Sequence, residues 1–459
     1  MARGAKKEIA LTPEEKLAQA LVPEAEQPYR VPENWKWVRL GTLGYTNIGL
    51  TYKPSDKSDE GTIVLRSCNI LDGRMVYDDI VKVSIDVPEN KMSKKGDILI
   101  CARNGSKSLV GKTAIIDDDG MSYGAFMAIF RSPYNKYVYY YLNSHYFRGI
   151  IDRDVGTTTI NQVTQQIIKE LPFPFAPLAE QKRIVDRIEN LFAKLDEAKE
   201  KAQAVVDGFE DRKAAILHKA FTGELTERWR IGKQITLDSW HAKRLSETSI
   251  TIIDGDRGKN YPKKEEFSPD GYCIFLNAKN VTKRGFVFDE VECITKEKDE
   301  LLHNGRLKRG DMVMTTRGTI GNVAVYDDSV PYEHLRINSG MVIYRGGIEF
   351  IKQYLIWLYQ SKLITTQIDN LRTGTAQPQL PIKVMNALVL PIPTIEEQKE
   401  IVETLNKLIT KEQQAKAVAE QVIDQIDTMK KAILARAFRG ELGTNDPMEE
   451  SAEGLLKAN

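Results

Sequence analysis

The 459-residue chain is poor in the residue types that build metal and redox sites. It has four cysteines, none in a Cys-x-x-Cys pair, and five histidines without ligand spacing. We therefore expect no metal site, and free thiols in a chain of this size favour a reducing cytoplasm. No window approaches the roughly 18 consecutive apolar residues of a membrane span. No apolar segment follows the basic N-terminal residues, so no signal peptide is expected.

Catalytic motifs are also lacking. The segment from Gly105 to Thr113 has one residue too many between its glycines for a phosphate-binding loop, and a β-branched stretch follows it where such a loop needs a helix. No Gly-x-Gly-x-x-Gly segment follows a strand pattern, and there is no Asn-Pro-Pro-aromatic segment of the kind that adenine methyltransferases use. The sequence therefore predicts a chain that is not an enzyme and binds no cofactor itself.

Net charge is low, at +1, but it is unevenly distributed. Residues 28–178 hold 19 basic against 16 acidic side chains, and residues 228–394 hold 24 against 19. The remaining segments are acidic. Two separate basic stretches form a modest footprint for nucleic acid, although ordinary variation of surface charge explains them equally well.

The chain contains an internal repeat. A Trp-x-x-x-Arg-Leu segment begins at Trp35 and again at Trp240. A Gly-Asp pair ends at Asp97 and again at Asp311, with an arginine six residues beyond each aspartate. The offset between copies changes from 205 (35 to 240) to 217 at the later Glu-Gln pairs (180–181 and 397–398) and then stays constant. We infer two heads with loops of different length, each followed by a segment held in register.

Two long helices are predicted, over residues 178–221 and 395–438. Prolines precede both segments, and Gly223 and Gly440 follow them as C-caps. Gly208 is the only glycine inside either segment and costs about 1 kcal/mol. Apolar residues recur at the coiled-coil spacing in both. The expected seam comprises Ile188, Leu191, Leu195, Ala198, Ala202, Val205, Phe209 and Ile216 with Leu405, Leu408, Ala415, Ala419, Val422, Ile426, Met429 and Ile433.

The expected fold class is α+β, with two mixed α/β heads separated by two long helices. Because the helices are equivalent, we expect them to pack on each other as an antiparallel coiled coil about a pseudo-two-fold axis; pairing with another protein is the alternative. A capping box at Thr12-Pro13-Glu14-Glu15 predicts a short N-terminal helix. The expected domains are an N-terminal extension (1–27), a first head (28–177), a central helix (178–227), a second head (228–394), a distal helix (395–442) and a C-terminal tail (443–459).

Basic and amide side chains cluster in glycine-rich stretches of both heads. Arginine and lysine read guanine or hold phosphates, and asparagine and glutamine pair with adenine edges. The DNA-binding candidates are Lys53, Arg66, Asn104, Lys107, Lys112, Asn161 and Gln162 in the first head, and Arg257, Lys259, Lys279, Arg336, Asn338, Gln377 and Gln379 in the second.

Some residues recur in both copies and are better explained as structural. Two heads that read different bases should differ where they touch them, so a recurring side chain is expected to hold its loop. Asn69 and Asn280 recur in this way. The expected structural loop residues are Arg103, Arg317, Gly111 and Gly321.

The whole pattern resembles the specificity subunits of type I restriction–modification systems. The resemblance rests on the Lys-Gly-Asp-Ile-Leu unit at 95–99 with its counterpart Arg-Gly-Asp-Met-Val at 309–313, the proline-bearing segments before Glu-Gln, and the Ala-Phe-x-Gly-Glu-Leu segments at 220–225 and 437–442. It covers about residues 12–442 and implies that each head is a target recognition domain for one half of a bipartite, asymmetric double-stranded DNA target.

The resemblance further implies two methyltransferase subunits as partners, with two motor-nuclease subunits as an option. S-adenosylmethionine, ATP and Mg²⁺ are expected on those partners and not on this chain. A non-catalytic bivalent scaffold that binds proteins or peptides is the alternative, and the basic excess of the heads argues weakly against it.

Overall fold

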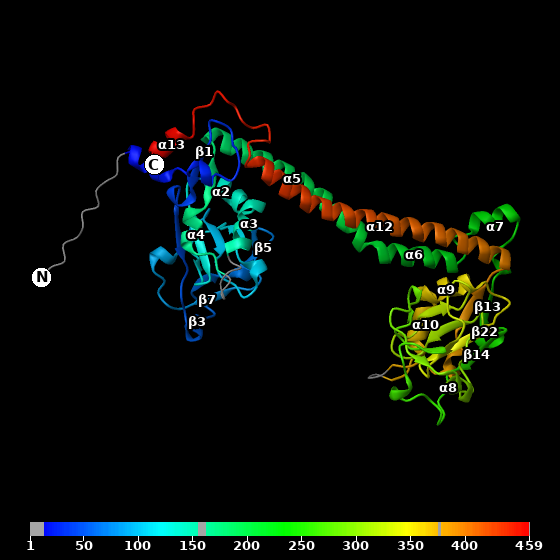
Figure 1. The fold of residues 1–459 in the computed structure, drawn as a ribbon. Helices are drawn as coiled ribbons and strands as arrows, with labels where there is room; N and C mark the ends of the chain where they lie inside the picture. The colour runs from blue at the N-terminus through cyan, green and yellow to red at the C-terminus, as the bar shows by residue number, and fades with distance from the viewer. Residues whose placement is uncertain (1–12, 155–161, 375–377, 459) are drawn as a thin grey trace. The chain divides into compact units, whose positions relative to one another are not determined.

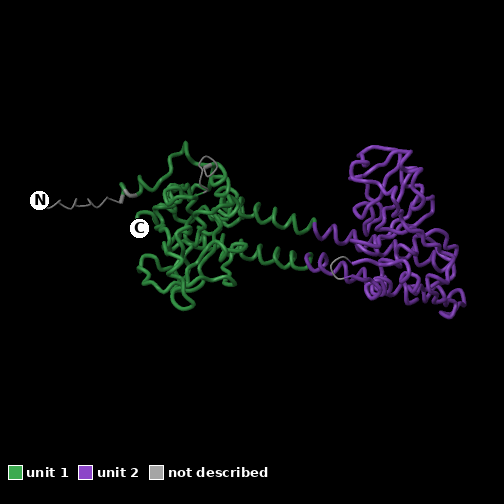
Figure 2. Tube along the Cα trace, turned by 90° about the horizontal axis from the view of Figure 1, so that it is seen from below, with its two compact units in different colours: residues 1–202, 421–459 green, residues 203–420 purple. Residues whose placement is uncertain are grey.

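The computed structural model describes residues 13–154, 162–374 and 378–458. The chain divides into two compact units, residues 1–202 with 421–459 and residues 203–420 (Figure 2). Each unit contains one head of mixed strands and helices, in agreement with the expected fold class. Asn161, Gln377 and Thr12 of the predicted capping box lie outside the described residues.

The first head is built on two four-stranded sheets (Figure 1). One has the order β2 (Tyr45–Ile48), β11 (Met127–Arg131), β8 (Ile98–Cys101), β9 (Thr113–Ile115). The other has the order β10 (Ser122–Tyr123), β4 (Thr62–Leu65), β7 (Val81–Val83), β3 (Lys57–Ser58). The head also contains two strand pairs, β1 (Lys36–Arg39) with β12 (Pro172–Phe175) and β5 (Ile70–Leu71) with β6 (Arg74–Met75). Its helices are α2 (Asn135–Leu142), α3 (His145–Asp154) and α4 (Gln165–Glu170).

The second head repeats this plan. Its four-stranded sheet has the order β14 (Ile250–Asp254), β22 (Met341–Gly346), β19 (Met312–Thr315), β20 (Val323–Val325). Its second sheet has the order β18 (Cys293–Ile294), β15 (Cys273–Leu276), β21 (Leu335–Ile337). The pairs are β13 (His241–Arg244) with β23 (Val389–Ile392) and β16 (Val281–Thr282) with β17 (Gly285–Phe286); the helices are α8 (Lys296–Leu301), α9 (Lys352–Gln360), α10 (Lys362–Leu371) and α11 (Ile382–Met385).

The repeated Gly-Asp motif forms the same buried ion pair in both heads. Arg131 Nε donates to Asp97 Oδ1 at 2.6 Å, and Arg345 Nε donates to Asp311 Oδ1 at 3.0 Å. A second guanidinium nitrogen bonds the other carboxylate oxygen in each case. Two parallel bonds to a buried carboxylate fix geometry as well as charge. The motif therefore ties β8 to β11, and β19 to β22.

The repeated Trp and Glu-Gln motifs meet each other. Trp35 Nε1 donates to Glu180 Oε2 at 2.6 Å, and Trp240 Nε1 donates to Glu397 Oε2 at 2.9 Å. Both carboxylates are buried. Since a buried carboxylate needs donors, the tryptophan that begins each head secures the first turn of the helix that follows it. Burial raises the pKa of the Glu180 carboxyl, against the hydrogen bond from Trp35.

The first long helix is divided at Gly208, where one continuous helix was expected. It consists of α5 (Leu178–Asp207) and α6 (Phe209–Phe221), whereas α12 (Ile395–Ala437) is uninterrupted. The side chain of Arg212 folds back here, and its Nη2 donates to Val205 O at 2.7 Å. A Cβ at Gly208 would lie 2.5 Å from Arg212 Nη1, so glycine makes room for this guanidinium. Arg212 Nε also donates to Glu412 Oε2 at 2.6 Å.

In the first unit the two helical segments run in opposite directions. Lys199 Nζ lies 2.9 Å from Asp427 Oδ1, and Asp196 pairs with Lys430. As the residue number rises along the first helix, the number of the partner residue on the second helix therefore falls. Six of the expected seam residues are buried: Ile188, Ala202, Phe209, Leu405, Ala419 and Ile426. Seven more are half-buried: Leu191, Leu195, Val205, Ile216, Leu408, Val422 and Ile433.

Three expected seam positions are wrong. Ala198, Ala415 and Met429 are exposed, Met429 to 48%. Each of the three lies between seam positions that are buried or half-buried, so the helix contact is interrupted locally and the helix does not rotate away from it. The pattern identified the right face of each helix but not every residue on it.

Ile426 and Met429 provide a matched pair of variants. Ile426→Ala should lower the unfolding free energy by about 2 kcal/mol, because it removes buried apolar surface, while Met429→Ala should change it by less than ~0.5 kcal/mol. Urea denaturation of the full chain measures both. Equal losses would restore Met429 to the contact face and contradict the structure.

The first and the last of the described helices lie in the first unit. The N-terminal helix α1 (Pro13–Ala20) packs against α13 (Glu453–Ala458). The tail between α12 and α13 is held as well, since Arg183 Nη1 lies 2.7 Å from Glu449 Oε1 and Ala452 N donates to Asn34 O. In the second unit, α7 (Glu227–Lys233) follows α6. Of the helices that the structure describes, none combines the length and apolar character needed to cross a membrane.

Candidate nucleic-acid interface

The same backbone frame recurs at one end of each head, where β8 and β19 leave their sheets. In the first head, Ala102 N and Arg103 N both donate to Phe126 O, at 3.0 and 2.9 Å. In the second, Thr316 N and Arg317 N both donate to Gly340 O, at 2.8 and 3.2 Å. Arg103 forms a β-bridge with Gln162, and Arg317 forms one with Gln379. These segments, called the loop frame below, hold the same relation in both heads.

A buried asparagine holds a neighbouring loop in each head. Asn69 Oδ1 accepts from Arg66 N at 2.8 Å, and Asn69 Nδ2 donates to two backbone carbonyls at 3.0 Å. Asn280 makes the equivalent bonds, accepting from Asn277 N at 3.0 Å and donating to two carbonyls. Every polar atom of these amides has a backbone partner, so both residues fix the loop and are not free to bind a ligand.

The surface side chains on this common support differ between the heads. Where the first head has Arg66, Cys68, Asn104 and Phe126, the second has Asn277, Lys279, Gly318 and Gly340. Asn104 Nδ2 donates to Ser67 Oγ at 3.2 Å, which connects the loop frame to the loop of Asn69. Two domains that bind different ligands are expected to share a rigid backbone and to differ in their surface side chains.

The structure brings several of the predicted DNA-binding residues to the loop frame. Gln162 and Gln379 are part of it, Asn104 follows Arg103, and Asn338 Oδ1 accepts from Gly340 N at 2.9 Å. Arg257 Nη2 donates to Ser339 O at 3.2 Å, so its loop joins the frame of the second head.

Other predicted DNA-binding residues bond to groups outside the loop frame, or make no contact that places them at it. Lys279 pairs with Glu290 at 2.9 Å, Arg66 pairs with Asp79 at 2.8 Å, and Lys107 donates to Asp152 O. Within the described part of the chain, no hydrogen bond or ion pair connects the side chain of Lys53, Lys112 or Lys259 to the frame.

Arg336 was wrongly expected to contact DNA. It is only 2% exposed, and its Nε donates to Asp299 Oδ1 at 2.7 Å while its Nη2 donates to Asp299 O at 2.9 Å. A guanidinium enclosed in this way holds α8 against β21 and cannot reach a ligand. An isolated arginine in a loop-like stretch carries no sequence signal that distinguishes these two roles.

Arg103 and Arg317 are expected to be structural loop residues, and that role stays a prediction. Both side chains are exposed, and the Arg103 guanidinium lies over the ring of Phe126. Gly111 and Gly321 do have backbones that favour glycine, with φ of +82° and +89°. A Cβ at Gly111 would lie 2.0 Å from Ile151 Cδ1.

The family of this chain follows from a comparison with known protein families. Residues 32–206 and 239–422 each match the type I restriction modification DNA specificity domain, so the match covers both heads and extends into both helices. The chain belongs to this family. The internal repeat is therefore a duplication of the specificity domain.

Specificity subunits of the family match along almost their whole length. The specificity subunit of the type I restriction enzyme EcoKI of Escherichia coli is 25% identical over 432 residues, covering 90% of both chains. The MjaVIII specificity subunit of Methanocaldococcus jannaschii is 26% identical and covers 90% of this chain and 94% of its own. The HsdS subunit of Thermoanaerobacter tengcongensis shares the fold, with a TM-score of 0.61, 19% identity, and coverage of 91% and 100%.

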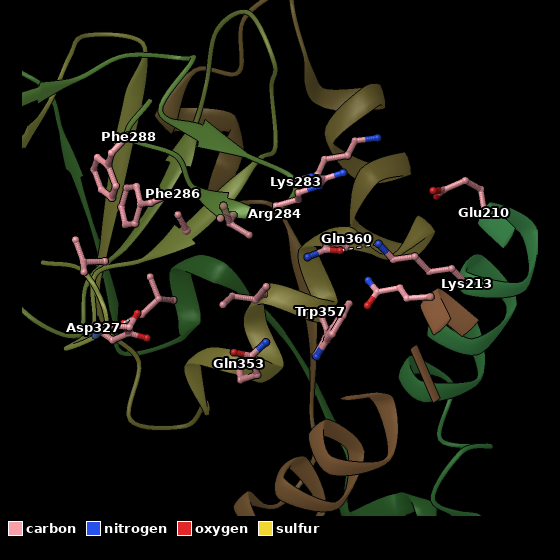
Figure 3. A pocket seen from close by; sticks show the side chains of 18 of the residues that line it. Glu210, Lys213, Lys283, Arg284, Phe286, Phe288, Asp327, Gln353, Trp357 and Gln360 are labelled. Carbon is pink, nitrogen blue, oxygen red and sulfur yellow. Dashed lines mark hydrogen bonds between the residues drawn. The ribbon is translucent and has the colours of Figure 1, made fainter. Parts of the chain in front are cut away.

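The second unit also has a cleft of about 1220 Å³, between the second specificity domain and helix α6, that the sequence did not indicate (Figure 3). Lys283 and Arg284 reach it from the turn between β16 and β17, and Lys213 donates to Gln360 Oε1 at 3.0 Å within it. Burial lowers the pKa of Lys213. In the first domain the equivalent turn is held instead, because Tyr139 donates to Gly73 O at 2.7 Å. The cleft thus belongs to one domain and not to the shared support.

No group of histidine, cysteine, aspartate and glutamate side chains suited to a metal ion occurs among residues 13–154, 162–374 and 378–458. The buried thiols of Cys101 and Cys273 have pKa values raised to about 11 by burial. Thiols with such pKa values are weak nucleophiles at neutral pH. The chemistry that the described side chains favour is binding by hydrogen bonds and charge at the loop frames.

Proposed function

We propose that this chain is the DNA sequence-recognition subunit of a type I restriction–modification enzyme. The observation that carries the proposal is the pair of loop frames: their backbone contacts are the same, and the side chains they present differ. Relatives that match nearly the whole chain are specificity subunits. Arginine, asparagine and glutamine at the frames are side chains that read base edges in the major groove.

Each head reads one half of a bipartite, asymmetric target in this proposal. The recurring Trp–Glu and Asp–Arg contacts support two copies of one reader. The proposal keeps the expected pseudo-two-fold repeat, with the two long helices as an antiparallel coiled coil. The polar pair Arg212–Glu412 then lies within the seam, where a single polar contact specifies register.

The helices serve as a spacer and as the docking surface for two methyltransferase subunits. Two motor-nuclease subunits join where the host has them, and S-adenosylmethionine, ATP and Mg²⁺ are held by those partners. The chain itself is non-catalytic. Its net charge of +1 fits this division, because phosphate contacts, which usually dominate affinity for DNA, can come from the partner subunits.

A bivalent scaffold that binds proteins or peptides is not favoured, because the relatives that match 90% of the chain are specificity subunits of restriction enzymes. The basic excess in the heads also fits DNA better than it fits a peptide without defined charge.

Exchange of the first head tests the proposal. Residues 28–177 are replaced by the corresponding head of a relative, and the chain is co-expressed with the methyltransferase subunit of its own system in a host that lacks adenine methylation. We expect one half of the methylated target to change completely while the other half remains, because each head is supported by its own contacts. Sequencing that detects methyladenine measures both halves.

The control is the unaltered chain in the same host. An unchanged target, or simultaneous change of both halves, would contradict reading by separate heads. Transfer of labelled methyl groups by the purified chain alone would contradict the non-catalytic role.

A further inference from the structure

We propose that Arg103, held on the ring of Phe126, contacts a guanine in the half-site read by the first head, and that these two residues determine specificity there. The inference rests on the proposed function and assigns one base contact within it. It concerns a site where the pattern of recurrence alone indicated a structural arginine.

Phe126 exposes a large apolar ring to solvent. It is 59% exposed, at the turn before β11, and its carbonyl is the one that holds the backbone of Arg103. The Arg103 guanidinium carbon lies 5.3 Å from the centre of the Phe126 ring. Main chain and side chain thus connect the same two residues, and the ring limits the directions that the guanidinium can take.

The guanidinium has no acidic partner among the residues that the structure describes. Arg66 and Arg131 in the same head are paired with Asp79 and Asp97. The side chain of Arg103 is exposed, and it lies on the loop frame beside Gln162.

The fork of Arg103 suits a phosphate as well as a base edge, since a guanidinium binds either through two parallel bonds. The surroundings favour a base, because the ring of Phe126 holds the guanidinium on the loop frame that also contains Gln162, a residue type that reads base edges. Guanine presents two acceptors, O6 and N7, that match the two-pronged donor geometry of arginine. Holding that geometry before binding reduces the entropy lost on contact.

The second head lacks the ring, which makes the arrangement specific to one half-site. Arg317 recurs, but the residue that accepts its backbone bond is Gly340. A Cβ at Gly340 would lie 3.6 Å from the Cβ and 4.0 Å from the Cδ of Arg317, so this arginine passes directly over the glycine. The same arginine therefore has different support in the two heads.

The test uses the full chain in complex with the methyltransferase subunit, without S-adenosylmethionine, to select duplexes randomised in both half-sites. Arg103→Ala should reduce the preference for guanine at one position about tenfold to a hundredfold, the range for loss of a bidentate arginine contact. Arg103→Lys should relax the same position although it keeps the charge. Phe126→Leu should relax it about twofold to fivefold, because the cation–π contact is lost.

Arg30→Ala is the matched control, an exposed arginine of the first unit outside the loop frame. Retained preferences in the other half-site and in Arg30→Ala would support the assignment. Uniform weakening at all sequences, or an unchanged preference for guanine in both Arg103 variants, would overturn it. If Arg103→Ala fails to fold or assemble, Arg103→Lys and Phe126→Leu decide the outcome. Failure of the unaltered complex to select any bipartite sequence would instead overturn the proposed function.

Discussion

Glu397→Ala is expected to lower the unfolding free energy by about 3–5 kcal/mol, the cost of breaking a buried ion pair by removing one partner. The side chains of Glu397 and Arg230 are 0% and 7% exposed, and Arg230 Nη1 lies 2.5 Å from Glu397 Oε1. Trp240 Nε1 and Thr226 Oγ1 also donate to this carboxylate, at 2.9 and 2.7 Å. Without it, a buried guanidinium loses its countercharge and two further donors lose their acceptor. Urea denaturation followed by tryptophan fluorescence measures the change.

The repeat provides the control. Glu180 occupies the equivalent position in the first unit, but its closest donors, Trp35 and Asn445, are neutral. Glu180→Ala therefore leaves no buried cation, and we expect a loss of about 1–3 kcal/mol, typical of unsatisfied buried donors. A larger loss for Glu180→Ala than for Glu397→Ala would show that the buried charge of Arg230 is not the dominant contribution.

Asp299→Ala is expected to have an effect of the same size, about 3–5 kcal/mol, for the same reason. The Arg336 guanidinium is almost completely enclosed, and Asp299 is its acidic partner in the described structure, also fully buried. The double variant Asp299→Ala with Arg336→Met should recover much of the loss, since replacing both members of a buried pair by apolar groups is often neutral. The same denaturation measurement applies to both.

An exposed pair in the same head serves as the comparison. Lys279 and Glu290 are 2.9 Å apart, with side chains 75% and 76% exposed. Glu290→Ala should change stability by less than ~1 kcal/mol, because solvent screens this pair. If Asp299→Ala were no more costly than Glu290→Ala, Arg336 would have to be accessible, and the original expectation of a DNA contact would stand again.

The repeat motifs show where reasoning from sequence succeeds and where it stops. Trp35 and Glu180 were both recognised as repeated, because each has a partner of the same type in the second half. Their hydrogen bond to each other was not foreseen, since it joins residues 145 positions apart. Likewise, Gly208 was counted as a cost to the helix, while the structure shows that it accommodates the side chain of Arg212.

The sequence by itself determined the duplication, the two long helices with their apolar face, and membership of the specificity family. These features depend on local periodicity and on the order of motifs, which the chain carries without reference to its fold. Only the tertiary structure decided that Arg336 faces inward, that Arg103 faces outward on a ring, and that Met429 leaves the contact face. Burial of a side chain is set by residues distant in sequence, so one arginine forms a structural ion pair in strand β21 and another is exposed in the loop after β8.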